Sequence, residues 1–189
     1  YRFKDAAKAN DACLPCHEGR VKNATAHTHH EAGTPGNQCV SCHMPMTEFA
    51  RMRRSDHSMR PPTPATTLAY QSPNACNLCH TNQGAAWADK FVREWRKRDY
   101  QRPVLERAAL IASARKADWT RLPDMLAYLS RPDREEIQAV SLVRLLANCP
   151  ADDKWPVLRK LADDPSPLVR ASAAEALGER LDQTNANAL

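Results

Sequence analysis

The chain has 189 residues and a formal net charge of +5, from 27 Lys and Arg against 22 Asp and Glu. That excess is too small and too dispersed to indicate a nucleic-acid partner, and the 42% hydrophobic content excludes a wholly disordered chain. No run approaches the ~20 apolar residues that a membrane-spanning helix needs. The sequence begins at Tyr1 without an apolar signal core, so we expect that a targeting segment has been removed or that the chain starts inside a longer protein.

Three copies of the pattern Cys-x-x-Cys-His lie in residues 1–82, at Cys13–His17, Cys39–His43 and Cys76–His80. One Cys-x-x-Cys could be a redox pair or half of a zinc site, but three copies that all end in His indicate covalent attachment of c-type haem. In such a site the two thiols form thioether bonds with the porphyrin, and the adjacent His binds the iron. We therefore predict three covalently bound haem c groups. The predicted attachment residues are Cys13, Cys16, Cys39, Cys42, Cys76 and Cys79, and the predicted proximal ligands are His17, His43 and His80.

Four further histidines lie in the same region: His27, His29, His30 and His57. Three irons need three sixth ligands, so these histidines allow bis-His coordination at every haem with one to spare. In an extended backbone the side chains of His29 and His30 would point to opposite sides and serve two haems. His27 would then share a side with His29 and is the expected spare, while His57 could reach back to any of the haems. The methionines of this region are interpreted as packing against porphyrin rather than as ligands.

Residues 1–82 are rich in Pro and poor in Leu, Ile and Val. Segments such as Gly33–Gly36 and Arg60–Pro64 interrupt any long helix. A stretch with so few large aliphatic residues cannot build an ordinary core. The sequence therefore predicts a loop-rich trihaem module whose porphyrins supply the missing apolar mass.

From Gly84 onward the pattern changes to amphipathic helices with short breaks. Trp87, Phe91 and Trp95 recur every four residues and predict an aromatic stripe on a helix over about 84–99. Further helices are expected over about 103–116, 119–130, 133–148, 152–163 and 166–181. Cys149, at the end of a Leu-rich segment, is interpreted as a small buried hydrophobe.

The later helices look repeated, because Leu122-Pro123 and Arg131-Pro132 recur 33 residues further on as Trp155-Pro156 and Asp164-Pro165. The stretch over residues 163–178 resembles a HEAT-type repeat, although the period is shorter than the ~40–47 residues of typical HEAT units. Each helix pair cannot bury its apolar face alone, so we expect the pairs to stack into a short solenoid. The predicted organisation is a trihaem module over 1–82, a connecting amphipathic helix over 83–101 and HEAT-like repeats over 102–189.

Two basic clusters stand out: Arg51, Arg53 and Arg54 form one, and Arg93, Arg96, Lys97, Arg98 and Arg102 form the other. One interpretation is a solvated face that also supplies partners for haem propionates. The other is a docking surface for an acidic redox partner.

Several of these motifs together resemble a family of multihaem c-type cytochromes. They are His27-Thr-His-His30, Gly36–Pro45 around the second Cys-x-x-Cys-His, Asp56-His-Ser-Met59 and Pro73–His80 around the third. In that family a haem region is often followed by HEAT or tetratricopeptide repeats. The resemblance implies electron transfer outside the cytoplasm through bis-His haems.

The sequence thus predicts a mainly α protein, with a loop-rich trihaem module and a helical HEAT-like solenoid. Its expected function is electron transfer between redox partners as a subunit of a larger complex, with the repeats as a docking arm and no enzymatic activity. The alternatives are a multihaem oxidoreductase with one open haem iron and a mainly structural haem-bearing assembly subunit. Because thioether attachment takes place outside the cytoplasmic membrane in bacteria, we expect a periplasmic or extracellular protein.

Overall fold

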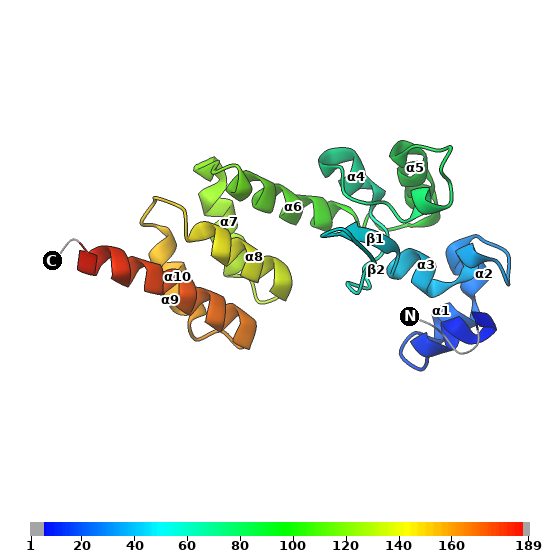
Figure 1. The fold of residues 1–189 in the computed structure, drawn as a ribbon, viewed down its shortest axis with the longest axis horizontal. Coiled ribbons are helices and arrows are strands. Elements are labelled where there is room, and N and C mark those ends of the chain that lie inside the picture. The colour runs from blue at the N-terminus through cyan, green and yellow to red at the C-terminus, as the bar shows by residue number, and fades with distance from the viewer. Residues whose placement is uncertain (1–5, 187–189) are drawn as a thin grey trace. The chain divides into compact units, whose positions relative to one another are not determined.

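The computed structural model describes residues 6–186, and the chain divides into two compact units, Tyr1–Gln101 and Arg102–Leu189 (Figure 1). Helices predominate, and the strands of the described residues form a single two-stranded hairpin. The expected mainly α fold is therefore confirmed. Within residues 6–186 no helix is long and apolar enough to cross a membrane.

The first unit opens with short helical segments separated by turns. They are the 3-10 helix η1 (Ala6–Cys13), helices α1 (Glu18–Lys22) and α2 (Ala24–Thr28), the 3-10 helix η2 (Pro35–Asn37) and helix α3 (Cys39–His43). Helix α3 contacts both η1 and η2. The first two Cys-x-x-Cys-His segments are therefore neighbours in space.

A β-hairpin that the sequence analysis did not anticipate follows α3. Strand β1 (Met46–Phe49) pairs antiparallel with β2 (Met52–Ser55), with Glu48 opposite Arg53. The two-residue turn places Ala50 and Arg51 at φ 48° and 64°. Both values lie in the left-handed region that tight hairpin turns require and that Asn-Gly usually supplies. The hairpin could not be predicted from the sequence, because Ala50-Arg51 stands where a two-residue turn usually has Asn-Gly.

The remainder of the first unit comprises helix α4 (Pro64–Tyr70), the 3-10 helix η3 (Cys76–Leu78) and helix α5 (Ala85–Trp95). Helices α4 and α5 pack against each other. The buried side chain of Gln101 joins them, because its Oε1 accepts from the Ala65 amide at 3.0 Å and its Nε2 donates to Asp89 at 2.7 Å. This contact fixes α5, which carries the aromatic stripe.

The second unit is wholly helical over the part that the structure describes. Its elements are α6 (Arg102–Arg115), the 3-10 helix η4 (Trp119–Arg121), α7 (Leu122–Leu129), α8 (Glu136–Leu146), α9 (Lys154–Leu161) and α10 (Pro167–Ala186). Helix α8 contacts both α6 and α10, while α9 contacts α7 and α10. The elements lie within a few residues of the expected helices, although α10 runs further than residue 181.

The core of the second unit is built from large aliphatic side chains. Met125, Leu129, Leu142, Leu146 and Leu158 are among the most deeply buried, and Cys149 is buried with them as expected. Two polar groups complete the interior. Lys154 donates from Nζ to the carbonyls of Leu146, Ala147 and Cys149 at the C-terminal end of α8, and Arg134 forms a buried ion pair with Asp164.

Candidate functional site

Each Cys-x-x-Cys-His segment folds as a single turn of helix. The amide of His17 donates to the carbonyl of Cys13 at 3.0 Å, and that of His80 donates to the carbonyl of Cys76 at 3.0 Å. The second copy forms helix α3. Residues three and four apart share one face of a helical turn, so this conformation places both thiols and the imidazole of each copy on the same side. None of the seven cysteines is in a disulfide.

Thiols of successive Cys-x-x-Cys-His segments lie near one another. Cys39 is hydrogen-bonded to Cys13, and burial together with that neighbour raises the pKa of Cys39 to about 11. Burial also raises the pKa of Cys42 to about 11, and the nearby thiols of Cys76 and Cys79 add to the shift. The second segment therefore lies between the first and the third.

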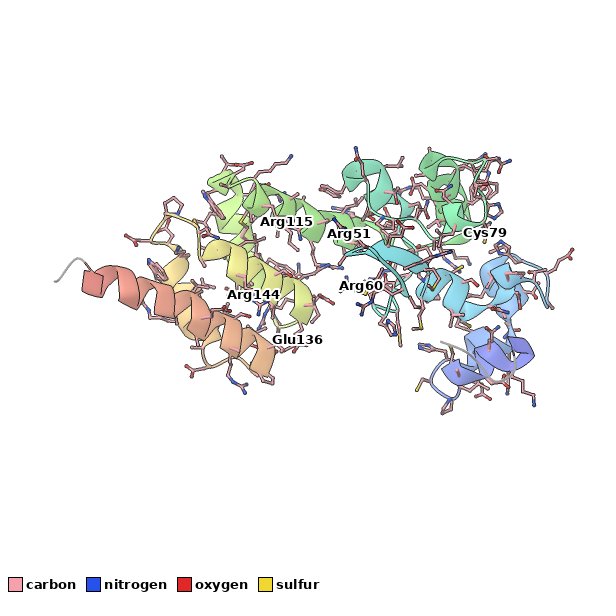
Figure 2. All side chains as sticks on the ribbon, in the orientation of Figure 1. Arg51, Arg60, Cys79, Arg115, Glu136 and Arg144 are labelled. Carbon is pink, nitrogen blue, oxygen red and sulfur yellow. The ribbon has the colours of Figure 1, made fainter. Side chains whose placement is uncertain are left out.

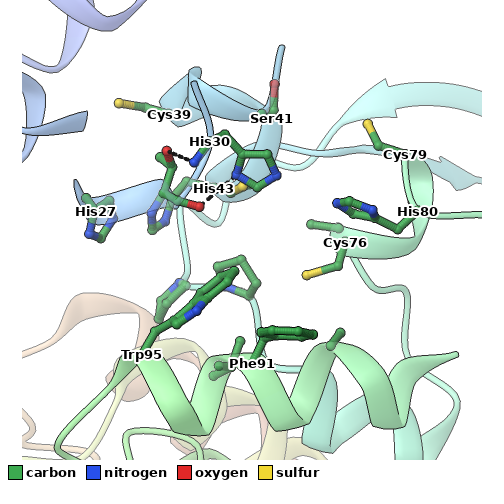
Figure 3. A pocket seen from close by; sticks show the side chains of 18 of the residues that line it. His27, His30, Cys39, Ser41, His43, Cys76, Cys79, His80, Phe91 and Trp95 are labelled. Carbon is green, nitrogen blue, oxygen red and sulfur yellow. Dashed lines mark hydrogen bonds between the residues drawn. The ribbon is translucent and has the colours of Figure 1, made fainter. Parts of the chain in front are cut away.

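Two pairs of imidazole rings face each other across the site (Figure 3). The rings of His27 and His43 have centroids 6.3 Å apart and planes inclined by 7°. The rings of His30 and His80 have centroids 6.0 Å apart and planes inclined by 43°. An imidazole nitrogen binds a transition metal at about 2.0 Å, with the ring centre about 1.1 Å beyond it, so two imidazoles on opposite sides of one iron have centroids about 6.2 Å apart. The centroid separations of both pairs match that spacing.

Backbone carbonyls fix the tautomer of three histidines. Nδ1 of His30 donates to the carbonyl of Thr28 at 2.7 Å, Nδ1 of His43 to that of Arg60 at 3.2 Å, and Nδ1 of His57 to that of Ser55 at 2.8 Å. A carbonyl can only accept, so the proton is on Nδ1 and the lone pair of Nε2 is left for a metal. Second partners of this kind are typical of metal-binding histidines.

The environment of His27 keeps its imidazole neutral. Burial, and then the positive charges of Arg96 and Arg20, lower the pKa of His27 to about 4. Neutral imidazole is the form that binds metals. Arg96 also holds the backbone of this segment, because its Nη2 donates to the carbonyl of His27 at 3.0 Å.

A polar network around Asn37 positions the segment that carries His30. The buried amide of Asn37 donates to the carbonyl of His30 at 3.0 Å and to the hydroxyls of Thr25 and Thr28. Gly36 lies directly against the His30 ring, since a Cβ there would be 2.3 Å from Cδ2. The glycine is therefore required by a close approach, and the ring of His30 is confined from that side.

Helix α5 forms the wall of the cavity between the histidines. The cavity holds about 1220 Å³ of empty space, its open mouth included, and the second and third attachment segments line it. The rings of Trp87, Phe91 and Trp95 follow one another along the helix at 4.9 and 5.7 Å, and Trp87 also meets His80 at 4.7 Å. These half-buried rings supply the flat apolar surface that a porphyrin packs against.

The backbone leading to His29 is helical, so the extended conformation that would point His29 and His30 to opposite sides is absent there. Residues 24–28 form helix α2, whose alanines favour helix, and His29 ends it in the left-handed conformation at φ 59°. The His29 ring stacks on Trp95 with centroids 4.1 Å apart. His17 and His57 are exposed, and within the described residues no other histidine ring contacts that of His17.

The family model of cytochrome c552 matches residues 24–121, slightly more than half of the chain. The chain belongs to the cytochrome c552 family. It is therefore a c-type cytochrome with covalently bound haem, a group of proteins that functions in electron transfer. No curated protein and no solved structure matches it. The matched range of the cytochrome contains the second and third Cys-x-x-Cys-His segments and the four additional histidines.

Sequence reasoning missed several residues that position the side chains predicted to bind haem in this cytochrome. Asn10 is one, because its side chain bonds both the Asn37 carbonyl and the Cys39 amide, at 3.0 and 2.9 Å. Asn37 and Tyr100 were also overlooked, and Arg96 was recognised only as part of a basic cluster. The steric role of Gly36 has a weak signal in hindsight, as a glycine three residues before an attachment cysteine.

Proposed function

We propose that this cytochrome holds three haems and passes electrons along them, with two of the irons bound by the pairs His27–His43 and His30–His80. The observation that carries this proposal is the spacing of the two ring pairs, 6.3 and 6.0 Å between centroids. Haem iron supplies a reversible one-electron couple when it is bound. The six cysteines of the three attachment segments would anchor the porphyrins.

The chain's own residues orient the ligands and shield them from water. The carbonyls of Thr28 and Arg60 set the tautomers of His30 and His43. The rings of Trp87 and Phe91 cover one side of the cavity. Because the three attachment segments are contiguous, the haems would lie close together and act as a short electron wire.

The third iron, bound through His17, has His29 and His57 as the remaining candidates for its sixth ligand. The exposed position of His17 without a histidine opposite its ring also favours a second candidate function. In that alternative, one haem iron keeps an open position, and the protein is a multihaem oxidoreductase.

For the cellular context, we propose a periplasmic or extracellular protein that works with redox partner proteins in a larger complex. The layered contacts among α7, α8, α9 and α10 support a HEAT-like stack in the second unit. A stack of this kind would serve as the docking arm of the cytochrome. A mainly structural role in assembly would use the same surface.

Low-temperature EPR of the fully oxidised protein, with spins counted per haem, tests the proposal. Three low-spin bis-nitrogen signals would support the wire, whereas a stoichiometric high-spin signal would support the enzyme. The ligand pairs are tested by His27→Ala and His30→Ala. Each variant is expected to convert a different low-spin signal to high spin, and the pairing is wrong if both variants affect the same signal or neither affects any.

A further inference from the structure

The β-hairpin presents a concentrated positive charge. Residues 46–55 contain three arginines and one glutamate, and Arg51, Arg53 and Arg54 are all exposed. Arg51 lies at the tip (Figure 2). Two methionines accompany them, Met46 with 41% and Met52 with 51% of the surface exposed. Arginine and methionine are both enriched in protein–protein interfaces.

The turn of the hairpin retains residues that do not suit it. Ala50 and Arg51 adopt φ 48° and 64°, in the left-handed region that strains a residue with a Cβ and favours Asn-Gly. Backbone strain of this kind concentrates at functional positions. A role for the guanidinium at the tip would account for an arginine at such a turn.

A groove connects the hairpin to the third attachment segment. It is lined by Met46, Glu48 and Arg53 on the hairpin side, and by Pro73, Asn74 and Leu78 on the other. Leu78 stands between the attachment residues Cys76 and Cys79 and is 50% exposed. A molecule seated in this groove would therefore touch the third attachment segment itself. We define the hairpin surface by its residues Met46, Arg51, Met52, Arg53, Arg54 and Leu78. Because side chains alternate along a strand, this surface includes both faces of the hairpin, with Arg53 on the groove side and Arg54 on the opposite side.

We propose that the hairpin surface docks the acidic face of a redox protein, beside the third attachment segment. The inference rests on the proposed electron-transfer function and adds the chemistry of the partner. Charge complementarity selects the partner, since the three exposed arginines of the hairpin outnumber its single glutamate, Glu48, and so attract a surface rich in Asp and Glu and steer its approach. Lipid headgroups are a poorer match, because polybasic membrane sites cluster about 4–8 Lys or Arg.

Titration calorimetry on the haem-loaded full chain tests the docking, with an acidic [2Fe–2S] ferredoxin as the probe. We expect the triple variant Arg51→Glu/Arg53→Glu/Arg54→Glu to raise the dissociation constant at least about tenfold at low salt. The matched control Arg115→Glu/Lys116→Glu/Arg159→Glu makes the same charge change at exposed positions of the second unit. It is expected to change the constant by less than about twofold. Equal losses in both variants, or none in the first, would overturn the proposal.

A single substitution separates the charge from the folding of the hairpin. Arg51→Gly removes the guanidinium but relieves the left-handed backbone at φ 64°, so we expect a hairpin that is at least as stable and a weaker complex. Unchanged binding by Arg51→Gly would contradict a role for the arginine.

Two further readouts distinguish the ways in which the idea can fail. The first is binding to vesicles that contain phosphatidylglycerol. If the chain binds these vesicles but not the ferredoxin, and the triple variant loses vesicle binding, the partner is a membrane rather than a protein. Haem content and EPR spectra are recorded on the same samples. Intact low-spin haems without ferredoxin binding would remove the docking proposal alone, whereas missing haems would remove the proposed function.

Discussion

Gly36 offers a direct test of whether His30 is an iron ligand. A Cβ at this position would lie 2.3 Å from Cδ2, 2.6 Å from Cγ and 2.8 Å from Nε2 of the His30 ring. Carbon atoms in ordinary contact are about 3.5–4.0 Å apart, so Gly36→Ala forces the ring to move by about 1 Å. Functional side chains must keep their geometry within about 0.5 Å. The displacement is therefore large enough to break an axial bond.

The surroundings of His30 leave the ring little room to adapt to the added methyl group. The Nδ1 of His30 donates to the carbonyl of Thr28 at 2.7 Å, and the backbone carbonyl of His30 accepts from the side-chain amide of Asn37 at 3.0 Å. We expect overpacking at this position to cost about 1–3 kcal/mol of unfolding free energy. With His30 as an iron ligand, as proposed, we also expect one low-spin haem to become high spin.

The assay is EPR with spin quantitation on purified Gly36→Ala, alongside thermal unfolding. Gly19→Ala and Gly84→Ala are matched controls, because a Cβ at either position meets nothing within 4 Å. Both controls should keep the native spectrum. A folded Gly36→Ala protein with an unchanged low-spin spectrum would refute the assignment of His30 as a ligand.

Three further predictions concern Tyr100, Lys154 and the third Cys-x-x-Cys-His segment. Burial raises the pKa of Tyr100, whose hydroxyl donates to the Pro62 carbonyl, to about 12. Because the unfolded chain loses this proton at a lower pH than the folded one, the free energy of unfolding should fall as the pH rises above about 10. Urea titrations at several pH values should show a smaller fall for Tyr100→Phe. Lys154→Met should cost about 2 kcal/mol of unfolding free energy, because three carbonyls at the end of α8 lose their donor, whereas the exposed Lys160→Met should be neutral. Cys76→Ser/Cys79→Ser should lower the haem count from three to two by mass spectrometry, and Cys149→Ser should leave it at three.

Features that depend on neighbouring residues could be predicted from the sequence. The spacing of Cys39, Cys42 and His43 predicts a haem-attachment segment, and in the structure these residues lie together in the single turn α3. The apolar periodicity of the second unit likewise anticipates its helices, because a helix with one buried face repeats every 3.6 residues.

Features that depend on distant residues could not be predicted. His30 and His80 face each other across 50 positions of sequence, and no local pattern encodes that partnership. His27 illustrates the problem, because an extended backbone makes it the spare histidine, whereas helix α2 turns its ring toward His43. The hairpin was missed for a different reason, since the Ala50-Arg51 turn lacks the residues that usually mark one.

The two units are stabilised by different kinds of interior. In the second unit, Leu129, Leu142 and Leu158 belong to one continuous apolar core. The buried apolar residues of the described part of the first unit are few and mostly small: Ala9, Met44, Ala65, Ala88 and Val92. Its larger apolar rings instead line the cavity and remain half-exposed.

That arrangement is what a unit organised around porphyrins requires. A hydrogen bond donated by Asn37 and one accepted by Gln101 set the positions of chain segments, but hydrogen bonds contribute only about 1 kcal/mol each to net stability. Burial of Trp87 and Trp95 against porphyrin would add the apolar contact that the polypeptide lacks, at roughly 25 cal/mol per Å². If the histidine pairs bind iron as proposed, haem attachment and folding of the first unit are coupled, and the pairs also stabilise the unit that positions them.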